Sequence, residues 1–237
     1  MNAPHLAAVL WDMDGTLVDT EAYWMSAETA LVESFGGSWS HEQALQLVGS
    51  GLEASATIFQ AAGVRMGVHD IVDHLTDDVM RQLATTGVPF RPGARELLAD
   101  LRDSEVKTAL VTMSLGRMAR TIVDLIDFDA FDVVVAGDDA TRPKPFPDAY
   151  LQACELLDVQ PSDSVAIEDS STGVRAAVAS GASVIGVPLM VSLTGAGAHT
   201  IWETLDGRTA RDVADFHQTH RARLRAGEGS PAEENAR

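Results

Sequence analysis

Residues 6–16 read Leu6-Ala-Ala-Val-Leu-Trp-Asp-Met-Asp-Gly-Thr16, an apolar run that ends at two carboxylates one residue apart. A short apolar run without polar alternation is typical of a strand buried on both faces. In an open α/β sheet, ligands bind outside the carboxyl ends of the strands. We therefore expect Asp12 and Asp14 to lie in a binding site rather than in an ordinary solvated turn.

Four further apolar runs follow, and segments with helical periodicity separate them. The runs are Lys107–Thr112, Phe131–Ala136, Ser164–Glu168 and Ala182–Val187. The helical segments are Ala94–Asp103, Met118–Leu125, Asp148–Leu157 and Gly173–Ser180. Strands that alternate with helices of this length predict βαβ units and a mostly parallel sheet. The predicted fold class is therefore α/β, with a Rossmann-like parallel sheet as its core.

The segment that follows the first strand has a different pattern. It carries helix-period stretches separated by glycines, at Tyr23–Phe35, His41–Leu47, Leu52–Ala62 and His69–Thr85. This pattern predicts a helical insertion over residues 19–88, with residues 1–18 and 89–224 forming the core. Helix is expected again across Ala198–Leu224, interrupted near Gly207. Residues 225–237 have little to bury and are predicted to be disordered.

Composition narrows the possible partners. The chain has 17 Lys and Arg against 35 Asp and Glu, a formal net charge of −18. Such a field repels phosphate backbones and anionic lipid, which argues against nucleic-acid and membrane partners. The sequence contains no run of 18 apolar residues, so we expect a soluble, cytoplasmic protein. A monomer is the default expectation, and the single Cys154 allows no intrachain disulfide.

Polar side chains gather where the other predicted strands end. The second strand ends in Thr112-Met-Ser114, the third is followed by Arg142-Pro-Lys-Pro145, and the fourth ends in Glu168-Asp-Ser170. Carboxylates clustered without a counter-ion would repel and raise one another's pKa. Mg²⁺ takes oxygen ligands, and a lysine can neutralise phosphate charge. The pattern therefore predicts a crevice that holds a divalent cation and a phosphoryl group, which a carboxylate can attack.

These motifs resemble, in order and spacing, the four signatures of the haloacid dehalogenase-like hydrolase superfamily. Asp12-Met-Asp-Gly-Thr-Leu-Val-Asp19 resembles its nucleophile loop, and Thr112, Lys144 before Pro145, and Glu168–Gly173 match the other three. The resemblance covers about residues 6–190 and extends to the branch of β-phosphoglucomutase and phosphoglycolate phosphatase. It implies that the helical insertion is an α-helical cap that closes over the site.

The resemblance also implies the roles of the central residues. Asp12 is the nucleophile and a metal ligand. Asp14 protonates the leaving oxygen and then takes a proton from water, while its main-chain carbonyl binds Mg²⁺. Glu168 and Asp169 complete the metal site.

The remaining site residues are implied in the same way. Thr112 and Lys144 hold the phosphoryl oxygens, helped by the backbone N–H groups of Met13, Asp14 and Met113. Thr16 is expected to orient Asp14. The substrate pocket is expected to include Thr16, Glu21, Trp24 and Ser114. Asp138 and Asp139 stand before the lysine loop, and whether either touches the metal stays open.

Departures from the family pattern favour one activity. Dehalogenases of the superfamily lack the second aspartate, so Asp14 favours phosphoryl transfer over carbon–halogen cleavage. The β-phosphoglucomutase branch has a histidine where this chain has Trp24, and a cap arginine near Leu52. We therefore expect a Mg²⁺-dependent phosphatase that acts on a small phosphorylated metabolite, such as a sugar, glycerol or nucleoside phosphate.

Two alternatives stay open. The first is a phosphomutase on the same scaffold. The second is a non-catalytic phosphoryl-binding regulator similar to a receiver domain. Receiver domains, however, place the acceptor aspartate after their third strand and lack a cap.

Overall fold

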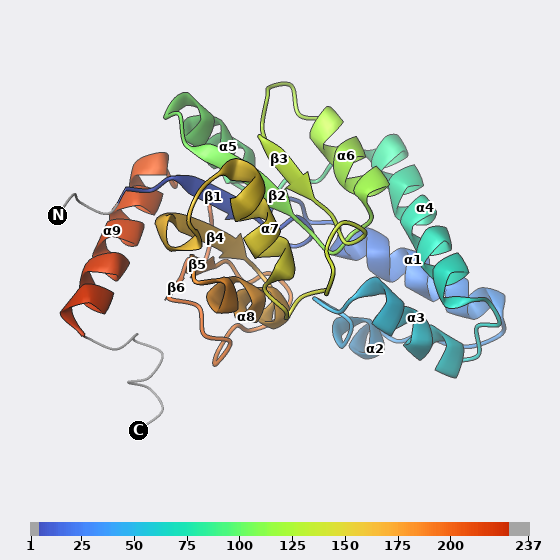
Figure 1. Ribbon diagram of the computed structural model, residues 1–237. Coiled ribbons are helices and arrows are strands. Elements are labelled where there is room, and N and C mark those ends of the chain that lie inside the picture. The colour runs from blue at the N-terminus through green and yellow to red at the C-terminus, as the bar shows by residue number, and fades with distance from the viewer. Residues whose placement is uncertain (1–4, 228–237) are drawn as a thin grey trace.

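The computed structural model describes residues 5–227 of the chain. Within this range the strands form a six-stranded sheet in the order β3-β2-β1-β4-β5-β6, and every neighbouring pair is parallel (Figure 1). The strands are β1 Ala8–Trp11, β2 Lys107–Val111, β3 Val133–Val135, β4 Ser164–Glu168, β5 Ser183–Gly186 and β6 Thr200–Ile201. The predicted α/β class with a Rossmann-like parallel sheet is confirmed.

Helices cover both faces of this sheet. They are α1 Glu21–Ser34, α2 His41–Leu45, α3 Leu52–Ala61, α4 Val68–Thr86, α5 Ala94–Asp103, α6 Gly116–Asp124, α7 Asp148–Leu157, α8 Ser171–Ser180 and α9 Ala210–Ala226. A short 3₁₀ turn, η1 Pro161–Asp163, precedes β4.

The side chains of β1 show how the two layers of core are divided. Val9 and Trp11 belong to the hydrophobic cluster that includes α5, α6 and α9, whereas Ala8 and Leu10 belong to the cluster with α7 and α8. Successive residues of a strand point to opposite faces of the sheet. Because both faces are covered, the whole of β1 is buried, which explains its unbroken apolar sequence.

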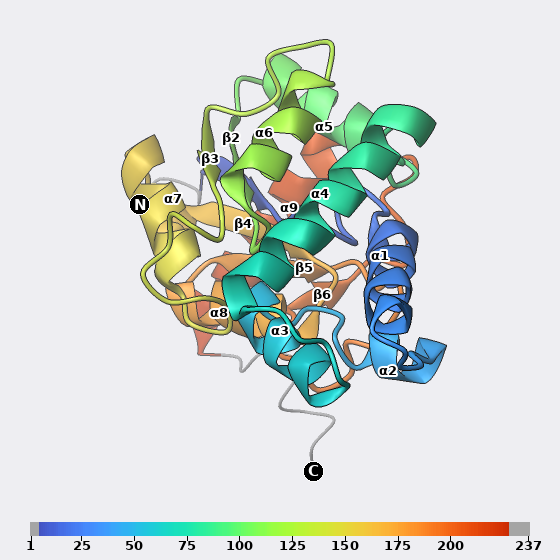
Figure 2. The ribbon, with the colours of Figure 1, turned by 90° about the vertical axis from the view of Figure 1, so that its right-hand side faces the viewer.

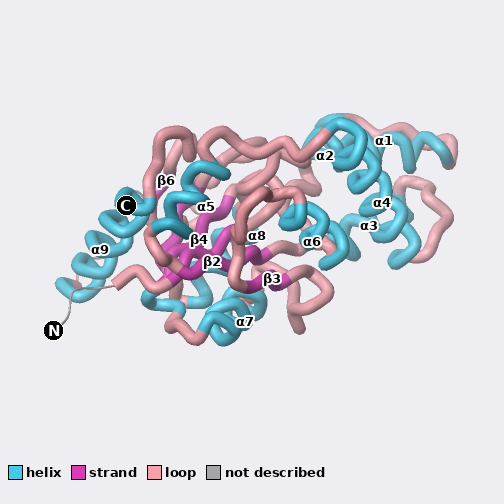
Figure 3. Tube along the Cα trace, turned by 90° about the horizontal axis from the view of Figure 1, so that it is seen from above, coloured by secondary structure: helices cyan, strands magenta, loops and turns pink. Residues whose placement is uncertain are grey.

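Helices α1 to α4 occupy the chain between β1 and α5 and gather at one end of the molecule (Figures 1 and 3). Helices α1 and α3 both pack against α4. Figure 2 views this end of the molecule directly, with α4 crossing in front of the sheet. The helical content predicted for this segment is therefore confirmed.

The prediction of helix across Ala198–Leu224 is wrong in its first half. Thr200–Ile201 instead forms β6, which extends the sheet beside β5. Helix α9 begins only at Ala210, where the Thr209 side chain and Asp212 form a capping box with reciprocal hydrogen bonds. The loop between them lets backbone N–H groups pair with the sheet edge, as when Trp202 N–H donates to the Gly186 carbonyl.

The prediction of disorder from residue 225 is wrong for Arg225 and Ala226, which belong to helix α9. Helix α9 continues through Ala226, and residues 228–237 lie outside the described range. None of the helices between residues 5 and 227 combines the length and the apolar character needed to cross a bilayer.

Candidate active site

The chain turns sharply after β1, and this turn places Asp12 and Asp14. Asp12 N–H donates to the Ile167 carbonyl of β4, and Gly15 N–H donates to the Val18 carbonyl at 2.8 Å. Gly15 has φ of 83°, and a Cβ built there would lie 2.0 Å from Asp169 Oδ2. Glycine is therefore required both by the backbone conformation and by the close approach of Asp169.

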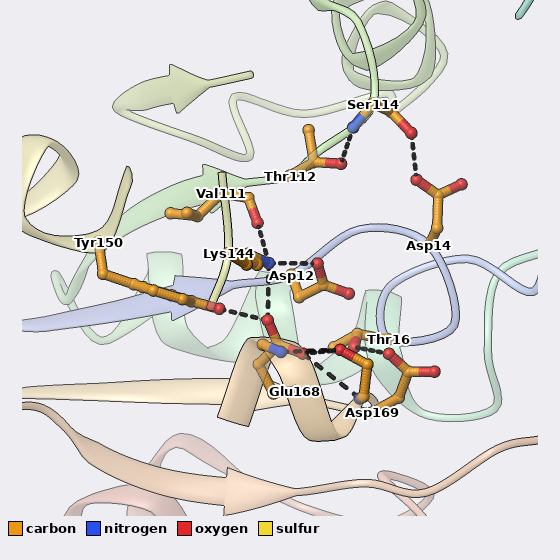
Figure 4. Close-up of polar contacts among 12 residues, drawn as sticks. Asp12, Asp14, Thr16, Val111, Thr112, Ser114, Lys144, Tyr150, Glu168 and Asp169 are labelled. Atoms are coloured by element: carbon orange, nitrogen blue, oxygen red, sulfur yellow. Dashed lines mark hydrogen bonds and ion pairs between the residues drawn. The ribbon is translucent and has the colours of Figure 1, made fainter. Parts of the chain in front are cut away.

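Three buried carboxylates meet at the ends of β1 and β4 (Figure 4). Asp12, Glu168 and Asp169 each offer an oxygen within 4.8 Å of the others. Burial, with the Glu168 charge, raises the pKa of Asp12 to about 7, although Lys144 opposes this shift. Burial and the charges of Asp12 and Glu168 raise the pKa of Asp169 well above its ordinary value. The negative charge of the three carboxylates is therefore not fully offset by the positive groups around them.

Lys144 supplies one cation to this cluster. Its Nζ lies 2.7 Å from Asp12 Oδ1, 2.6 Å from Glu168 Oε1 and 3.0 Å from the Val111 carbonyl. Burial alone would lower the pKa of Lys144, but the two carboxylates raise it above its ordinary value. The side chain is therefore a fixed ammonium whose three donors are all engaged.

Glu168 is enclosed on every side. The Tyr150 hydroxyl donates to Oε1 at 2.6 Å, and the Ser170 hydroxyl donates to Oε2 at 3.2 Å. A Cβ on Gly173 would lie 1.9 Å from Oε1. Both oxygens thus have partners, whereas Asp169 Oδ2 is buried with no hydrogen-bond partner among residues 5–227. No local pattern separates Tyr150 from the other core residues of α7.

The Asp14 carboxylate is held apart from this cluster by three donors. Ser114 Oγ donates to Oδ2 at 2.6 Å, and Trp24 Nε1 donates to Oδ1 at 3.0 Å. Thr20 Oγ1 also donates to Oδ1. Helix α1 supplies Trp24 from its first turn, and the loop after β2 supplies Ser114.

The expectations for Thr16 are wrong. Its hydroxyl donates to Asp169 Oδ1 at 3.4 Å rather than to Asp14, and the residue is fully buried outside the cavity lining. The cause is the turn at Gly15, which directs Thr16 toward β4. Thr20, four residues later, takes the place beside Asp14 that was expected for Thr16.

The expected phosphate-binding residues lie around the same strand ends. Thr112 Oγ1 accepts a hydrogen bond from Ser114 N–H at 3.0 Å, and Thr112 and Met113 line the cavity described below. Met13 is fully buried, and its carbonyl accepts hydrogen bonds from Leu17 N–H and other amides of the turn. The phosphate contacts of these residues stay predictions.

Asp138 and Asp139 are engaged in local structure instead of the cluster. Asp138 Oδ1 accepts a 2.8 Å hydrogen bond from Gly116 N–H, at the first residue of α6. Asp139 Oδ2 accepts one from Ala136 N–H at 2.9 Å. Within the described chain neither joins the three-carboxylate group.

A cavity of about 100 Å³ lies between the carboxylates and helices α1 to α4. Asp12, Asp14 and Lys144 lie at its base, and the predicted pocket residues Glu21, Trp24 and Ser114 line its walls. The floor of the cavity carries carboxylates and one lysine, and helices cover it. Such a cavity can hold a metal-bound phosphoryl group and the group attached to it.

The family model for haloacid dehalogenase-like hydrolases matches residues 9–187. The chain belongs to this family. The matched region runs from β1 to just beyond β5 and so includes Asp12, Lys144 and Asp169. The family predicted from the four motifs is confirmed.

Named relatives of this haloacid dehalogenase-like hydrolase include phosphatases. A phosphorylated carbohydrates phosphatase of Thermotoga maritima is 30% identical over 178 residues, covering 74% of this chain and 82% of the relative. A phosphoglycolate phosphatase of Chromobacterium violaceum is 30% identical over 203 residues, covering 79% and 87%. The crystal structure of CbbY from Rhodobacter sphaeroides in complex with phosphate superposes with a TM-score of 0.80 at 26% identity, covering 89% of this chain and 99% of that one.

One residue that supports the site in this hydrolase was not anticipated. Arg91 is buried, and its Nη1 donates to the carbonyls of Gly15 and Val187, both at 2.6 Å. Its Nη2 donates to the Pro188 carbonyl at 3.3 Å. The guanidinium thus joins the loop after β1 to the loop after β5. Its position between two prolines in Pro89-Phe-Arg-Pro-Gly93 gave only the signal of a connecting loop.

Proposed function

We propose that this protein is a Mg²⁺-dependent phosphatase that hydrolyses a small phosphate monoester through an aspartyl-phosphate on Asp12. The observation that carries the proposal is the meeting of the Asp12, Glu168 and Asp169 carboxylates within 4.8 Å, with Lys144 bonded to Asp12. The phosphatase names of the relatives support it.

The donor set suits Mg²⁺, because every donor in the cluster is an oxygen. Asp169 Oδ2 is buried without a partner, and buried carboxylates in such a group need a compensating cation. We assign the ion to Asp12, Asp169 and the Asp14 carbonyl. Both Glu168 oxygens already accept hydrogen bonds, which supports a role in holding Lys144 as well as in the metal site. Mg²⁺ would supply the positive charge that offsets the phosphoryl oxygens during attack.

The protein groups divide the reaction into two steps. An Asp12 oxygen bonds to phosphorus while the bond from phosphorus to the ester oxygen breaks, and Asp14 gives its proton to the departing alkoxide. Water then attacks phosphorus, Asp14 takes the proton from that water, and the bond from phosphorus to Asp12 breaks. Lys144 and Thr112 hold the phosphoryl oxygens in both steps.

We assign residues 19–88 to a cap and residues 1–18 and 89–224 to the core. Helices α1 to α4 supply most of the wall of the cavity that the core residues floor. Arg117 of α6 reaches Asp73 Oδ1 at 2.7 Å and Asp77 Oδ1 at 3.0 Å on α4, which supports a closed arrangement of the two parts. A closed cap excludes bulk water from the phosphoryl centre.

Hydrolysis is preferred over the phosphomutase alternative. A mutase must bind a second phosphate group of its substrate, and this binding needs a cation in the cavity wall. Among residues 5–227, Lys144 is the single Lys or Arg that lines this cavity, and we assign it to the transferred phosphoryl group, which leaves no cation for a second phosphate. The acidic composition further supports a cytoplasmic, monomeric enzyme as part of this proposal.

The test compares Asp12→Asn with Asp124→Asn, a control at an exposed position on α6. A malachite-green screen of phosphorylated metabolites in Mg²⁺ first finds a hydrolysed substrate. We expect Asp12→Asn to lose at least about 10³-fold in kcat while its circular dichroism stays unchanged. EDTA is expected to abolish wild-type turnover, and Mg²⁺ to restore it. Retained turnover in Asp12→Asn, or indifference to chelation, would refute the proposal.

A further inference from the structure

Helix α1 turns an acidic face toward the cavity. Glu21, Trp24, Met25 and Glu28 follow one another at i, i+3, i+4 and i+7, and all four line the cavity. This spacing puts side chains on a single stripe of a helix. Figure 2 shows α1 beside α4 at the end of the molecule where the cavity lies. Two carboxyls, two turns apart, therefore face the group attached to the phosphoryl centre.

Within residues 5–227, neither carboxyl pairs with a cation. Glu28 is only 8% exposed, and in this range its one hydrogen bond comes from Trp39 Nε1, which donates to Oε2 at 3.2 Å. Glu21 has no hydrogen bond or ion pair with a side chain in the described range. Burial, then the charges of Asp14 and Glu28, raise the pKa of Glu21 to about 8. Burial raises the pKa of Glu28 to about 7 against the Trp39 hydrogen bond. A buried carboxylate is costly unless a positive charge lies beside it.

A hydroxyl lines the same cavity as Glu28, the more buried of the two carboxyls. Ser55 of α3 lines the cavity, is 7% exposed, and its Oγ has no hydrogen-bond partner within residues 5–227. One turn further along α3, Phe59 packs against Trp39 with ring centroids 5.0 Å apart. Because Trp39 bonds to Glu28, Ser55 and Glu28 belong to the same end of the cavity. The Ser55 hydroxyl and the free oxygen of the Glu28 carboxyl can therefore both accept hydrogen bonds from one donor group.

The other residues of the cavity wall disfavour polyol and anionic substrates. Leu47, Leu52 and Phe59 are among its apolar members and offer no partners to a chain of hydroxyls. The ammonium of Lys144 lies at the phosphoryl centre, bonded to Asp12 and Glu168. A second phosphate or a carboxylate on the substrate would therefore meet the acids of α1 without a cation to bind it.

We propose that the leaving alcohol carries a protonated amine on an aliphatic chain, so that the substrate is an aminoalkyl phosphate whose ammonium binds Glu28 and Ser55. Glu21, on the same stripe of α1, offers no positive charge to an anionic substrate. The methylene chain packs against the apolar wall. This inference rests on the proposed phosphatase activity and names the substrate class of the same site.

The test is a charge series at matched chain length. The wild-type enzyme in Mg²⁺ is assayed for kcat/KM on ω-aminoalkyl, n-alkyl and ω-carboxyalkyl phosphates of increasing length, and on polyol phosphates. At the best length we expect the amine to exceed the neutral ester by about tenfold or more, because charge-assisted hydrogen bonds are the strong ones. The carboxylate should be the poorest substrate.

A matched pair of variants assigns this preference to one residue. Glu28→Gln keeps an acceptor oxygen for Trp39 but removes the charge, so the ratio of amine to neutral kcat/KM should fall toward one. Glu33→Gln makes the same change at an exposed position of α1 and should keep the wild-type ratio.

The outcomes separate the inference from the proposed function. An amine no better than the neutral ester, a preferred polyol phosphate, or an unchanged ratio in Glu28→Gln overturns the inference alone. If Glu28→Gln does not fold, the wild-type series decides. If no phosphate ester releases phosphate in Mg²⁺, the proposed function itself fails.

Discussion

Ser114 and Asp14 are 100 positions apart in the sequence, yet Ser114 Oγ donates a 2.6 Å hydrogen bond to Asp14 Oδ2 (Figure 4). The bond joins the loop after β2 to the loop after β1. Together with Thr20 and Trp24, it fixes the direction of the carboxyl to which we assign both proton transfers. The position of the Asp14 carboxyl is thus set jointly by the loop after β2, by Thr20 and by helix α1.

Loss of the Ser114 hydroxyl should therefore weaken catalysis more than binding. We expect Ser114→Ala to lower kcat about tenfold with a smaller change in KM, because a misplaced proton donor slows the chemical step. Steady-state kinetics on any substrate found in the screen measures this. Ser38→Ala, at an exposed position, is the control. An unchanged kcat in Ser114→Ala would show that the hydrogen bond does not position Asp14.

The ion pairs between α6 and α4 should affect substrate affinity. Arg117 of α6 is bonded to Asp73 and Asp77 of α4. Exposed pairs contribute about 0.2–1 kcal/mol each; because the two pairs share one guanidinium, we expect a total of about 0.4–1 kcal/mol, so Arg117→Ala should raise KM by roughly 2–5-fold. In the wild type, added NaCl should raise KM, and this salt effect should be weaker in the variant. The control is Arg120→Ala, an exposed position on the same helix; equal behaviour of the two variants would exclude the proposed closure contact.

Arg91 should be needed for stability. Its guanidinium donates to the carbonyls of Gly15, Val187 and Pro188 while buried. Arg91→Met leaves these carbonyls without their donor, and we expect a loss of about 2–4 kcal/mol in the free energy of unfolding. Urea denaturation measures the loss, with the exposed Arg175→Met as control. A loss equal to that of the control would mean that the loops after β1 and β5 hold their positions without Arg91.

A buried histidine should make the fold sensitive to acid. His217 is fully buried on α9, and its Nδ1 lies 3.1 Å from Ser183 Oγ. Burial, together with the charge of Arg221, lowers the pKa of His217 to about 4 from an ordinary 6.5. Between these values the unfolded chain binds more protons than the native one, so stability falls as the pH falls from 6.5 toward 4. At pH 5 the loss from this residue should be on the order of 1 kcal/mol relative to pH 7.5.

The measurement compares the wild type with His217→Phe, because buried acids such as Glu21, whose pKa values are raised, have the opposite pH dependence. Between pH 7.5 and 5 the free energy of unfolding of the wild type should drop more steeply than that of the variant. Parallel curves for the two proteins would contradict the assignment to His217.

Much of the fold and of the site chemistry was predictable from local sequence. Five buried strands could be read from apolar runs because both faces of the sheet are covered. Asp12, Lys144 and Asp169 could be placed together because parallel strands bring their carboxyl ends to one edge. The short β6 could not be found in this way, since Thr200–Ile201 is a strand only through its pairing with β5.

The errors within the site have a common cause. Thr16 was placed beside Asp14 because it follows closely in sequence, but the left-handed backbone at Gly15 turns it to Asp169. Tyr150 contacts Glu168, which lies 18 positions away in the sequence. Arg91 contacts Gly15, which lies 76 positions away. Such partners are set by the packing of α7 and of the connecting loop, and no local pattern marks them.

Phosphorylation of Asp12 during turnover can be detected by rapid acid quench followed by mass spectrometry of the digested protein. The enzyme is mixed with a hydrolysed substrate in Mg²⁺, quenched within the first turnover, and the peptide that contains Asp12 is sequenced. We expect one added phosphoryl group on the Asp12 side chain, absent from Asp12→Asn. Steady turnover with that peptide unmodified at every quench time, or with the phosphoryl group on another residue, would contradict it.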